Sequence, residues 1–265
     1  MVERAVVIVT GASRGLGAAT AQILGRLGAQ VVLTARSTRL LEQEARQMAA
    51  SGGSALTVPG DVSKEADCRE IVQRALDRFG RIDSLVHNAG VVEPIEPVAE
   101  LDPEEWQQNW KVNLLGPAML TQMALPELRK RKGRVIFITS GSAENVVGGW
   151  GAYSTAKAAA NHLVRILARE EPEITTLALR PGIVDTQMQA TIRDKGKSHM
   201  AEENYKWLYG LYEQGKLLPP DQPGLATACL ALYAPQDWSG EILQWDERRV
   251  RELVKAHDEP GAYPE

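Results

Sequence analysis

The stretch Val7-Ile-Val-Thr-Gly-Ala-Ser-Arg-Gly-Leu-Gly17 decides the fold of this chain. It begins with an apolar, β-branched run typical of a buried strand, and its glycines Gly11, Gly15 and Gly17 precede a helical pattern. Glycines at such a turn let the backbone approach a ligand closely, and the amides at a helix N-terminus attract a pyrophosphate. Strand, glycine turn and helix in this order predict a dinucleotide-binding site.

Apolar runs alternate with longer helical patterns along the rest of the chain. The expected strands cover residues 5–10, 30–35, 55–59, 84–87, 134–139, 175–180 and 241–245, and the expected helices cover 15–28, 38–51, 64–79, 102–128, 153–170 and 221–233. Apolar strands joined by helices form parallel sheets that are covered on both faces. We therefore expect an α/β fold of the doubly wound Rossmann type, with about seven parallel strands.

We expect residues 1–257 to form a single catalytic domain. Residues 186–220 interrupt the alternation with aromatic and methionine side chains among charges. They are expected to form a mobile, partly helical flap on the substrate side, with a surface excursion or a subunit contact as the alternative. Residues 258–265 are expected to be a loose tail or to pack on a neighbouring subunit.

Composition argues against several kinds of partner. The 265 residues are 44% hydrophobic with a net charge of −4, which gives no electrostatic basis for binding nucleic acid or an anionic membrane. The basic cluster at 129–132 falls where a helix is expected to end, and cations favour that end. Cys68 and Cys229 lack the spacing of a metal site or a disulfide framework, so no metal is expected. Because no signal-peptide pattern or membrane-length apolar run is present, we expect a cytoplasmic protein.

Tyr153 and Lys157 are candidates for acid–base chemistry. They stand one helical turn apart and therefore share a face of the expected helix. A phenol has a pKa of about 10, and a neighbouring ammonium favours its ionised form. Tyr212 and Lys216 repeat the spacing, but they follow no strand and have no counterpart of Ser140, so we interpret them as a coincidence.

The end of the second expected strand indicates which nicotinamide cofactor is used. An acidic residue there would bind the adenosine ribose of NAD, but the run Val31-Val-Leu-Thr-Ala-Arg36 contains none. Arg36 and Arg14 are instead suited to clamp a ribose 2′-phosphate, because guanidinium groups match phosphate geometry. The two arginines predict NADP, with NADPH as the hydride donor.

With these features together, the chain resembles the short-chain dehydrogenase/reductase family over nearly its whole length. The likeness rests on motifs that follow one another in the family's order: Thr10-Gly-x-x-x-Gly-x-Gly17, Asp61-Val62, Asn88-Ala-Gly90, Asn113, Ser140, Tyr153-x-x-x-Lys157, and Pro181-Gly182 with Thr186.

The resemblance implies a role for each matched residue. Tyr153 would donate a proton to a carbonyl, Ser140 would hydrogen-bond its oxygen, and Lys157 would lower the pKa of Tyr153 and hold the nicotinamide ribose. Asn113 would anchor a water that links Lys157 to solvent. Arg36 joins the expected cofactor-binding residues because of its suitability for a 2′-phosphate. The full set is Gly11, Ser13, Arg14, Gly15, Leu16, Gly17, Arg36, Asp61, Val62, Asn88, Ala89, Gly90, Tyr153, Lys157, Pro181, Gly182, Val184 and Thr186.

A narrower likeness, to the sepiapterin reductase branch and the related benzil reductase-like enzymes, rests on Gly149-Trp150-Gly-Ala-Tyr153, Glu170-Glu171-Pro172 and residues 181–189. It implies reduction of an α-diketone or of a pterin side-chain ketone. Asp246 and Glu247 are candidates for the acid that holds a pterin. The candidate substrate-pocket residues are Ser142, Trp150, Met188 and Trp207, of which the last three are alternatively core or interface residues.

The leading hypothesis is an NADPH-dependent carbonyl reductase that acts on a small-molecule ketone or α-diketone. One alternative is an NAD-linked alcohol or steroid dehydrogenase, against which Arg36 argues. Another is a catalytically silent NADP-binding regulator on the same fold. The resemblance also implies a homodimer or homotetramer formed through the helices expected at 102–128 and 153–170.

Overall fold

A seven-stranded parallel sheet forms the centre of the computed structural model, which describes residues 4–257. Its strands are β1 (Val6–Thr10), β2 (Gln30–Thr34), β3 (Ser54–Thr57), β4 (Ser84–His87), β5 (Arg134–Ile138), β6 (Thr175–Arg180) and β7 (Ile242–Gln244). Their order in the sheet is β3-β2-β1-β4-β5-β6-β7, so the direction of winding reverses between β1 and β4. This is the predicted doubly wound fold.

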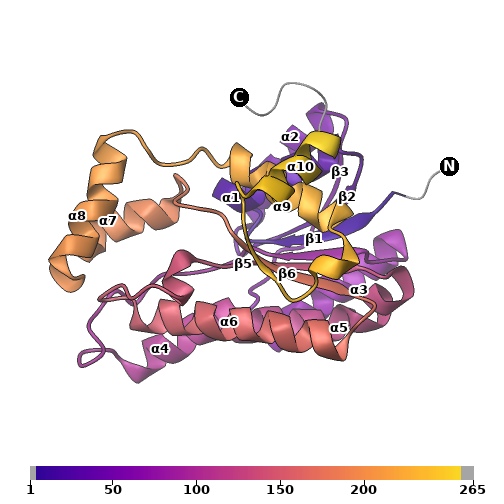
Figure 1. Ribbon diagram of the computed structural model, residues 1–265. Coiled ribbons are helices and arrows are strands. Elements are labelled where there is room, and N and C mark those ends of the chain that lie inside the picture. The colour runs from indigo at the N-terminus through magenta and orange to yellow at the C-terminus, as the bar shows by residue number, and fades with distance from the viewer. Residues whose placement is uncertain (1–3, 258–265) are drawn as a thin grey trace.

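Helices cover both faces of the sheet (Figure 1). One face carries α1 (Gly15–Arg26), α2 (Thr38–Ala50), α9 (Asp221–Tyr233) and α10 (Arg248–His257), and the other carries α3 (Glu65–Phe79), α5 (Gly116–Arg131) and α6 (Gly151–Glu170). Within β1, Val7 and Val9 pack into the first core, whereas Val6 and Ile8 pack into the second. β1 is apolar on both sides because it serves two cores, which is why no polar alternation appears in its sequence.

The helix expected at 102–128 consists of three parts in the structure. α4 (Pro103–Trp110) is followed by a π-helical turn, Lys111–Leu115, and then by α5. Asp102 caps the start of α4, since its Oδ1 accepts hydrogen bonds from the amides of Glu104 at 2.7 Å and Glu105 at 3.2 Å. The π-helical turn lies at Asn113, and such turns inside a helix often mark functional sites.

The segment 186–220 is largely helical, with α7 (Gln187–His199) and α8 (Glu202–Glu213). Figure 1 shows this pair, in orange, standing apart from the two helical layers. Sequence patterns missed α10, and they placed the start of α6 two residues too late. The mobility of the flap and the single-domain boundary stay predictions, and the tail expected at 258–265 lies outside the described residues.

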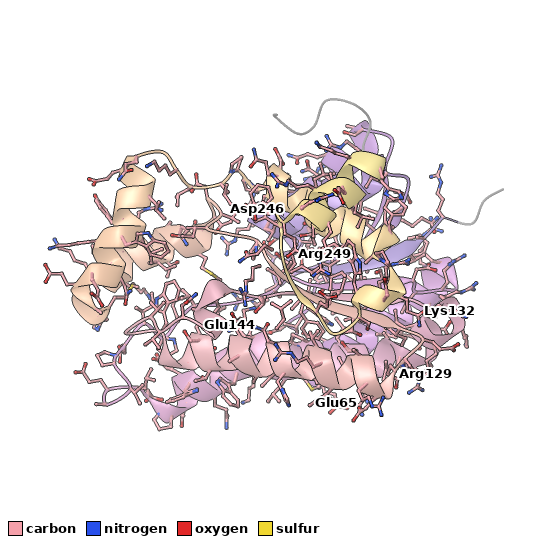
Figure 2. The ribbon with its side chains drawn as sticks, in the orientation of Figure 1. Glu65, Arg129, Lys132, Glu144, Asp246 and Arg249 are labelled. Atoms are coloured by element: carbon pink, nitrogen blue, oxygen red, sulfur yellow. The ribbon has the colours of Figure 1, made fainter. Side chains whose placement is uncertain are left out.

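The basic cluster at 129–132 lies at the C-terminal end of α5, as predicted (Figure 2). Arg129 is paired with Glu171 at 2.5 Å, and Lys132 lies 3.7 Å from Glu173. Carboxylates therefore face much of this charge. Between residues 4 and 257, no helix is both long enough and apolar enough to span a bilayer.

Candidate active site

A cavity of about 730 Å³ opens at the carboxyl ends of the parallel strands. The loops that follow β1 to β6 all contribute to its wall, and α7 and α8 complete it. The cavity lies beside the reversal of winding between β1 and β4, where doubly wound sheets bind their ligands.

The loop between β1 and α1 shapes one end of this cavity. Gly11 and Gly15 adopt positive φ values of 66° and 55°, and a Cβ on Gly15 would approach Thr186 to 3.0 Å. Such backbone angles and such limited space favour glycine at Gly15. The N-terminus of α1 has no side-chain cap, so its first amides remain available to an anion. This cradle fits the pyrophosphate of a dinucleotide.

Asn88 fastens the glycine loop to the end of β4. Its Nδ2 donates to the carbonyl oxygens of Thr10 at 2.9 Å and Gly11 at 3.2 Å. Gly17, expected to contact the cofactor, is not among the residues that line the cavity. A Cβ there would lie 2.4 Å from both Asn88 Nδ2 and the Gly11 oxygen. Gly17 therefore leaves room for the bond that holds the loop, whereas Asn88 itself reaches the cavity wall.

Two exposed arginines and one carboxylate lie at the end of the cavity formed by the loops after β1, β2 and β3. Arg14, Arg36 and Asp61 all line it. Burial is the largest single influence on Asp61 and acts to raise its pKa, but hydrogen bonds from Ser63 and the charges of Arg36 and Lys64 together lower that pKa. Asp61 is thus ionised and faces part of the positive charge of Arg36.

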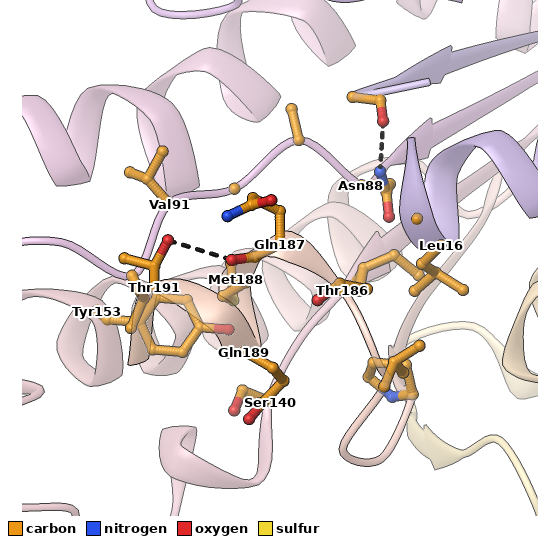
Figure 3. A pocket seen from close by; sticks show the side chains of 18 of the residues that line it. Leu16, Asn88, Val91, Ser140, Tyr153, Thr186, Gln187, Met188, Gln189 and Thr191 are labelled. Atoms are coloured by element: carbon orange, nitrogen blue, oxygen red, sulfur yellow. Dashed lines mark hydrogen bonds between the residues drawn. The ribbon is translucent and has the colours of Figure 1, made fainter. Parts of the chain in front are cut away.

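Ser140 and Tyr153 meet at the other end of the cavity. Ser140 follows β5, Tyr153 lies in the first turn of α6, and both line the cavity, with the Ser140 hydroxyl near enough to the phenol to act on its pKa. Burial raises the pKa of Tyr153 to about 12, and the nearby Ser140 hydroxyl offsets this rise only in part. The tyrosine consequently keeps its proton at neutral pH. Figure 3 shows both side chains at one part of the wall, with Gln189 there as well.

Lys157 lies behind Tyr153 in the same helix. Its Nζ donates to the carbonyl oxygen of Ile138 at 2.8 Å, and burial lowers its pKa to about 8. Burial dominates the pKa of Tyr153 in this structure and raises it, and the lowering of that pKa by Lys157 stays a prediction. The ammonium lies 5.7 Å from the centre of the phenol ring and is hydrogen-bonded to the backbone.

Asn113 supports the wall but is not among the residues that line it. From the π-helical turn, its Nδ2 donates to the Val91 carbonyl at 2.8 Å and its Oδ1 accepts from the Val91 amide at 3.3 Å. A Cβ on Gly90 would lie 2.9 Å from Asn113 Oδ1 and 3.6 Å from Lys157 Nζ. Because Gly90 has no side chain, Asn113 and Lys157 can approach the same point. The water expected to link Lys157 to solvent through Asn113 stays a prediction.

The expected substrate residues Ser142, Trp150, Met188 and Trp207 all line the cavity. Trp150 is buried and packs edge-on against Tyr153, with ring centres 5.7 Å apart. It belongs to an apolar cluster with Ile192, Met200 and Leu208, against which Met188 packs. Trp150 is therefore both a core residue and part of the wall, whereas Trp207 is 57% exposed.

The α7–α8 pair packs closely on the loop before α6. Asn204 Oδ1 accepts a hydrogen bond from the amide of Gly148 at 3.2 Å, and a Cβ on Gly149 would lie 2.6 Å from the carbonyl oxygen of His199. The two glycines thus allow the turn between α7 and α8 to approach the segment that carries Trp150 and Tyr153.

Sequence patterns missed several residues of the wall, namely Val92, Arg180, Gln189, Ile192, Asn204, Leu208 and Gln244. Gln189 lies one helical turn after Thr186, and this spacing was the available signal. Neither Asp246 nor Glu247 is among the cavity-lining residues: Glu247 accepts from the Gln244 amide at 2.9 Å and pairs with Arg249. Figure 2 marks Asp246 and Arg249 in this region.

The second Tyr–Lys pair differs from the first in its surroundings. Tyr212 is exposed, and the guanidinium of Arg193 stacks on its ring at 3.9 Å. Lys216 follows the end of α8, and neither residue lines the cavity.

Comparison with known proteins agrees with this geometry. Residues 5–197 match the family model of the short chain dehydrogenases. The uncharacterized oxidoreductase YIR035C of Saccharomyces cerevisiae is 37% identical over 94% of this chain and 98% of its own, and its crystal structure superposes with a TM-score of 0.90, covering 94% and 99% of the two chains.

Two further similarities concern proteins with named ligands or activities. A benzil reductase ((S)-benzoin forming) of Bacillus cereus is 33% identical over 91% of this chain and 99% of its own. An alcohol dehydrogenase from the archaeon Thermococcus sibiricus, complexed with 5-hydroxy-NADP, is 33% identical with a TM-score of 0.77, covering 91% and 96%. The chain belongs to the short-chain dehydrogenase family of nicotinamide-dependent oxidoreductases, on its benzil reductase-like branch.

Proposed function

We propose that this protein is an NADPH-dependent carbonyl reductase acting on a ketone or an α-diketone, with Tyr153 as the proton donor. The observation that carries the proposal is the buried Tyr153, which keeps its hydroxyl proton and lines, with Ser140, the same cavity as the glycine loop. A hydride donor held at that loop and a carbonyl at Ser140 would occupy one continuous space.

The residues suited to hold the cofactor are the amides of the glycine loop for the pyrophosphate, and Arg14 with Arg36 for a 2′-phosphate. When bound, NADPH supplies the hydride that reduces the carbonyl carbon. The absence of an acid in the stretch 31–36, and the NADP analogue bound to the archaeal relative, support this choice of cofactor.

Tyr153 transfers its hydroxyl proton to the carbonyl oxygen as charge develops there. Ser140 donates a hydrogen bond to the same oxygen and stabilises that charge. The ammonium of Lys157, in the same dehydrated interior, favours the phenolate that remains. A tyrosine that holds its proton until the oxygen becomes strongly basic is suited to this step.

The wall opposite the glycine loop favours an apolar substrate. Trp150, Met188 and Trp207 present aromatic and thioether surface to the cavity. The relatives named benzil reductase, from Bacillus cereus and from Saccharomyces cerevisiae, support an aromatic diketone as the substrate class. We further propose a homodimer or homotetramer, through α4–α5 and α6.

The test is an assay of the protein on a panel of diketones, aromatic ketones and pterins. Turnover of each compound is measured as the loss of NADPH absorbance. We expect turnover of at least one aromatic ketone or diketone, with a higher kcat/KM for NADPH than for NADH. Tight NADPH binding without turnover of any member would instead favour a silent regulator. Faster alcohol oxidation with NAD would favour the dehydrogenase alternative.

A further inference from the structure

Gln189 is a largely buried residue whose side-chain amide has no hydrogen-bond partner among the described residues. The residue is 8% exposed and lines the cavity, and no described residue donates to or accepts from its side chain. Only its backbone amide is engaged, with the Thr186 carbonyl at 3.0 Å. The buried amides of Asn109, Asn113 and Asn161 are all hydrogen-bonded, so Gln189 differs from them.

The amide atoms of Gln189 are not among the fully buried unpaired polar atoms of the described residues, so the amide is open to the cavity rather than enclosed in the packed interior. Because no described residue hydrogen-bonds this amide and it is open to the cavity, it is available to a ligand that enters there. Figure 3 places Gln189 at the part of the wall that carries Ser140 and Tyr153. The amide therefore faces the reacting end of a substrate rather than the adenosine end of the cavity.

We infer that Gln189 is a specificity-determining residue that hydrogen-bonds a second oxygen of the substrate, on the carbon next to the reacting carbonyl. The inference rests on the proposed function. Tyr153 and Ser140 serve the reacting oxygen, and the hydroxyl of neighbouring Ser142 is bonded to Ser140 at 3.1 Å. The Gln189 amide remains for the adjacent oxygen.

An amide suits this task because it both donates and accepts. Its Nε2 donates to the second oxygen of a vicinal dicarbonyl, and its Oε1 accepts from the hydroxyl of an α-hydroxyketone. A simple ketone has no second oxygen and would leave the Gln189 amide without a partner in the bound complex. A site built to hydrogen-bond a group discriminates against analogues that lack that group.

The experiment compares Gln189→Leu with the wild-type protein on a matched pair of substrates. Benzil and deoxybenzoin share one skeleton, and deoxybenzoin carries a methylene in place of the second carbonyl. We expect Gln189→Leu to lower kcat/KM for benzil by about tenfold or more, and that for deoxybenzoin by less than about threefold. Gln43→Leu, at an exposed position on α2 outside the cavity, serves as the control and should change neither.

Equal losses on both substrates would indicate a purely structural role and overturn the inference. A higher KM for NADPH with both substrates would make Gln189 a cofactor contact and overturn it as well. If Gln189→Leu does not fold, Gln189→Glu takes its place, since an ionised carboxylate of nearly the same shape cannot donate to benzil. A wild-type protein that reduces neither compound with NADPH defeats the proposed function and this inference together, whereas equal losses defeat this inference alone.

Discussion

The ammonium of Lys157 lies 5.7 Å from the centre of the Tyr153 ring, and both side chains are buried. Burial moves their pKa values in opposite directions, that of Tyr153 up to about 12 and that of Lys157 down to about 8. In each case burial favours the neutral form of the side chain, because a dehydrated interior disfavours charge. The pair thus holds a protonated phenol beside an ammonium that gives up its proton more readily than usual.

Replacing Tyr153 by phenylalanine should remove the proton donor without changing the fold of the site. General acid catalysis contributes about 10²–10⁴-fold, so kcat should fall by that factor for every carbonyl that the wild-type protein reduces. NADPH binding, measured by fluorescence titration, should stay within about threefold, because the phenol hydroxyl is a small part of the cofactor contact.

Tyr212→Phe is the matched control for this substitution. Tyr212 is exposed and lies outside the cavity, so its kinetics should equal those of the wild-type protein. Near-normal turnover by Tyr153→Phe, or a comparable loss in Tyr212→Phe, would remove Tyr153 from the proposed role.

Lys157 should reduce stability at neutral pH. Its pKa falls from the usual 10.5 to about 8 in the fold, so between these values the unfolded chain binds more protons than the folded one. Stability therefore rises with pH through this window, and the penalty is fully present below pH 8. The shift corresponds to a penalty on the order of 3 kcal/mol, reduced by about 1 kcal/mol for the bond to Ile138.

Lys157→Met should accordingly raise Tm at pH 7 by several degrees while abolishing most of the activity. The difference in Tm should shrink as the pH approaches 10, where the wild-type lysine is neutral in the fold. Thermal unfolding of both proteins across this range checks the sign. A lower Tm for Lys157→Met at pH 7 would show that the ammonium stabilises the fold.

Arg36→Ala should alter the choice of cofactor. If Arg36 binds the 2′-phosphate, its loss should lower kcat/KM for NADPH by about tenfold or more and leave NADH within about threefold. Arg39→Ala, an exposed arginine outside the cavity, is the control. Equal or better use of NADH by the wild-type protein would refute the assignment of NADP.

Gly17→Ala should damage the cofactor loop through packing. The new Cβ would lie 2.4 Å from the backbone oxygen of Gly11, which cannot move without displacing the loop. We expect a loss of about 1–3 kcal/mol in the free energy of unfolding, with weaker NADPH binding. Gly210→Ala in α8 meets only Gln214 at 3.6 Å and should stabilise the protein by about 0.5–1 kcal/mol. Chemical denaturation of both variants tests the contrast, and equal effects would contradict it.

Local sequence determined the sheet and the positions of the glycine loop and of the Tyr153–Lys157 pair. The inner strands, such as β1 and β4, are buried on both faces, so their apolar runs are visible in the chain. The glycines of the β1–α1 loop are visible because their backbone angles and limited space restrict the residue type. Tyr153 and Lys157 are coupled by helix geometry, and their spacing therefore carried information without the fold.

Only the tertiary structure decided what depends on surfaces meeting from distant parts of the chain. Examples are the π-helical turn at Asn113 and the contact of Asn204 with Gly148, which joins residues far apart in sequence. A further example is the amide of Gln189, which faces a cavity between elements. The direction of the Tyr153 pKa shift belongs here too. Proximity to Lys157 along the helix predicts a decrease, but the rise is set by how completely the fold removes the phenol from water, and that burial is a property of the whole structure.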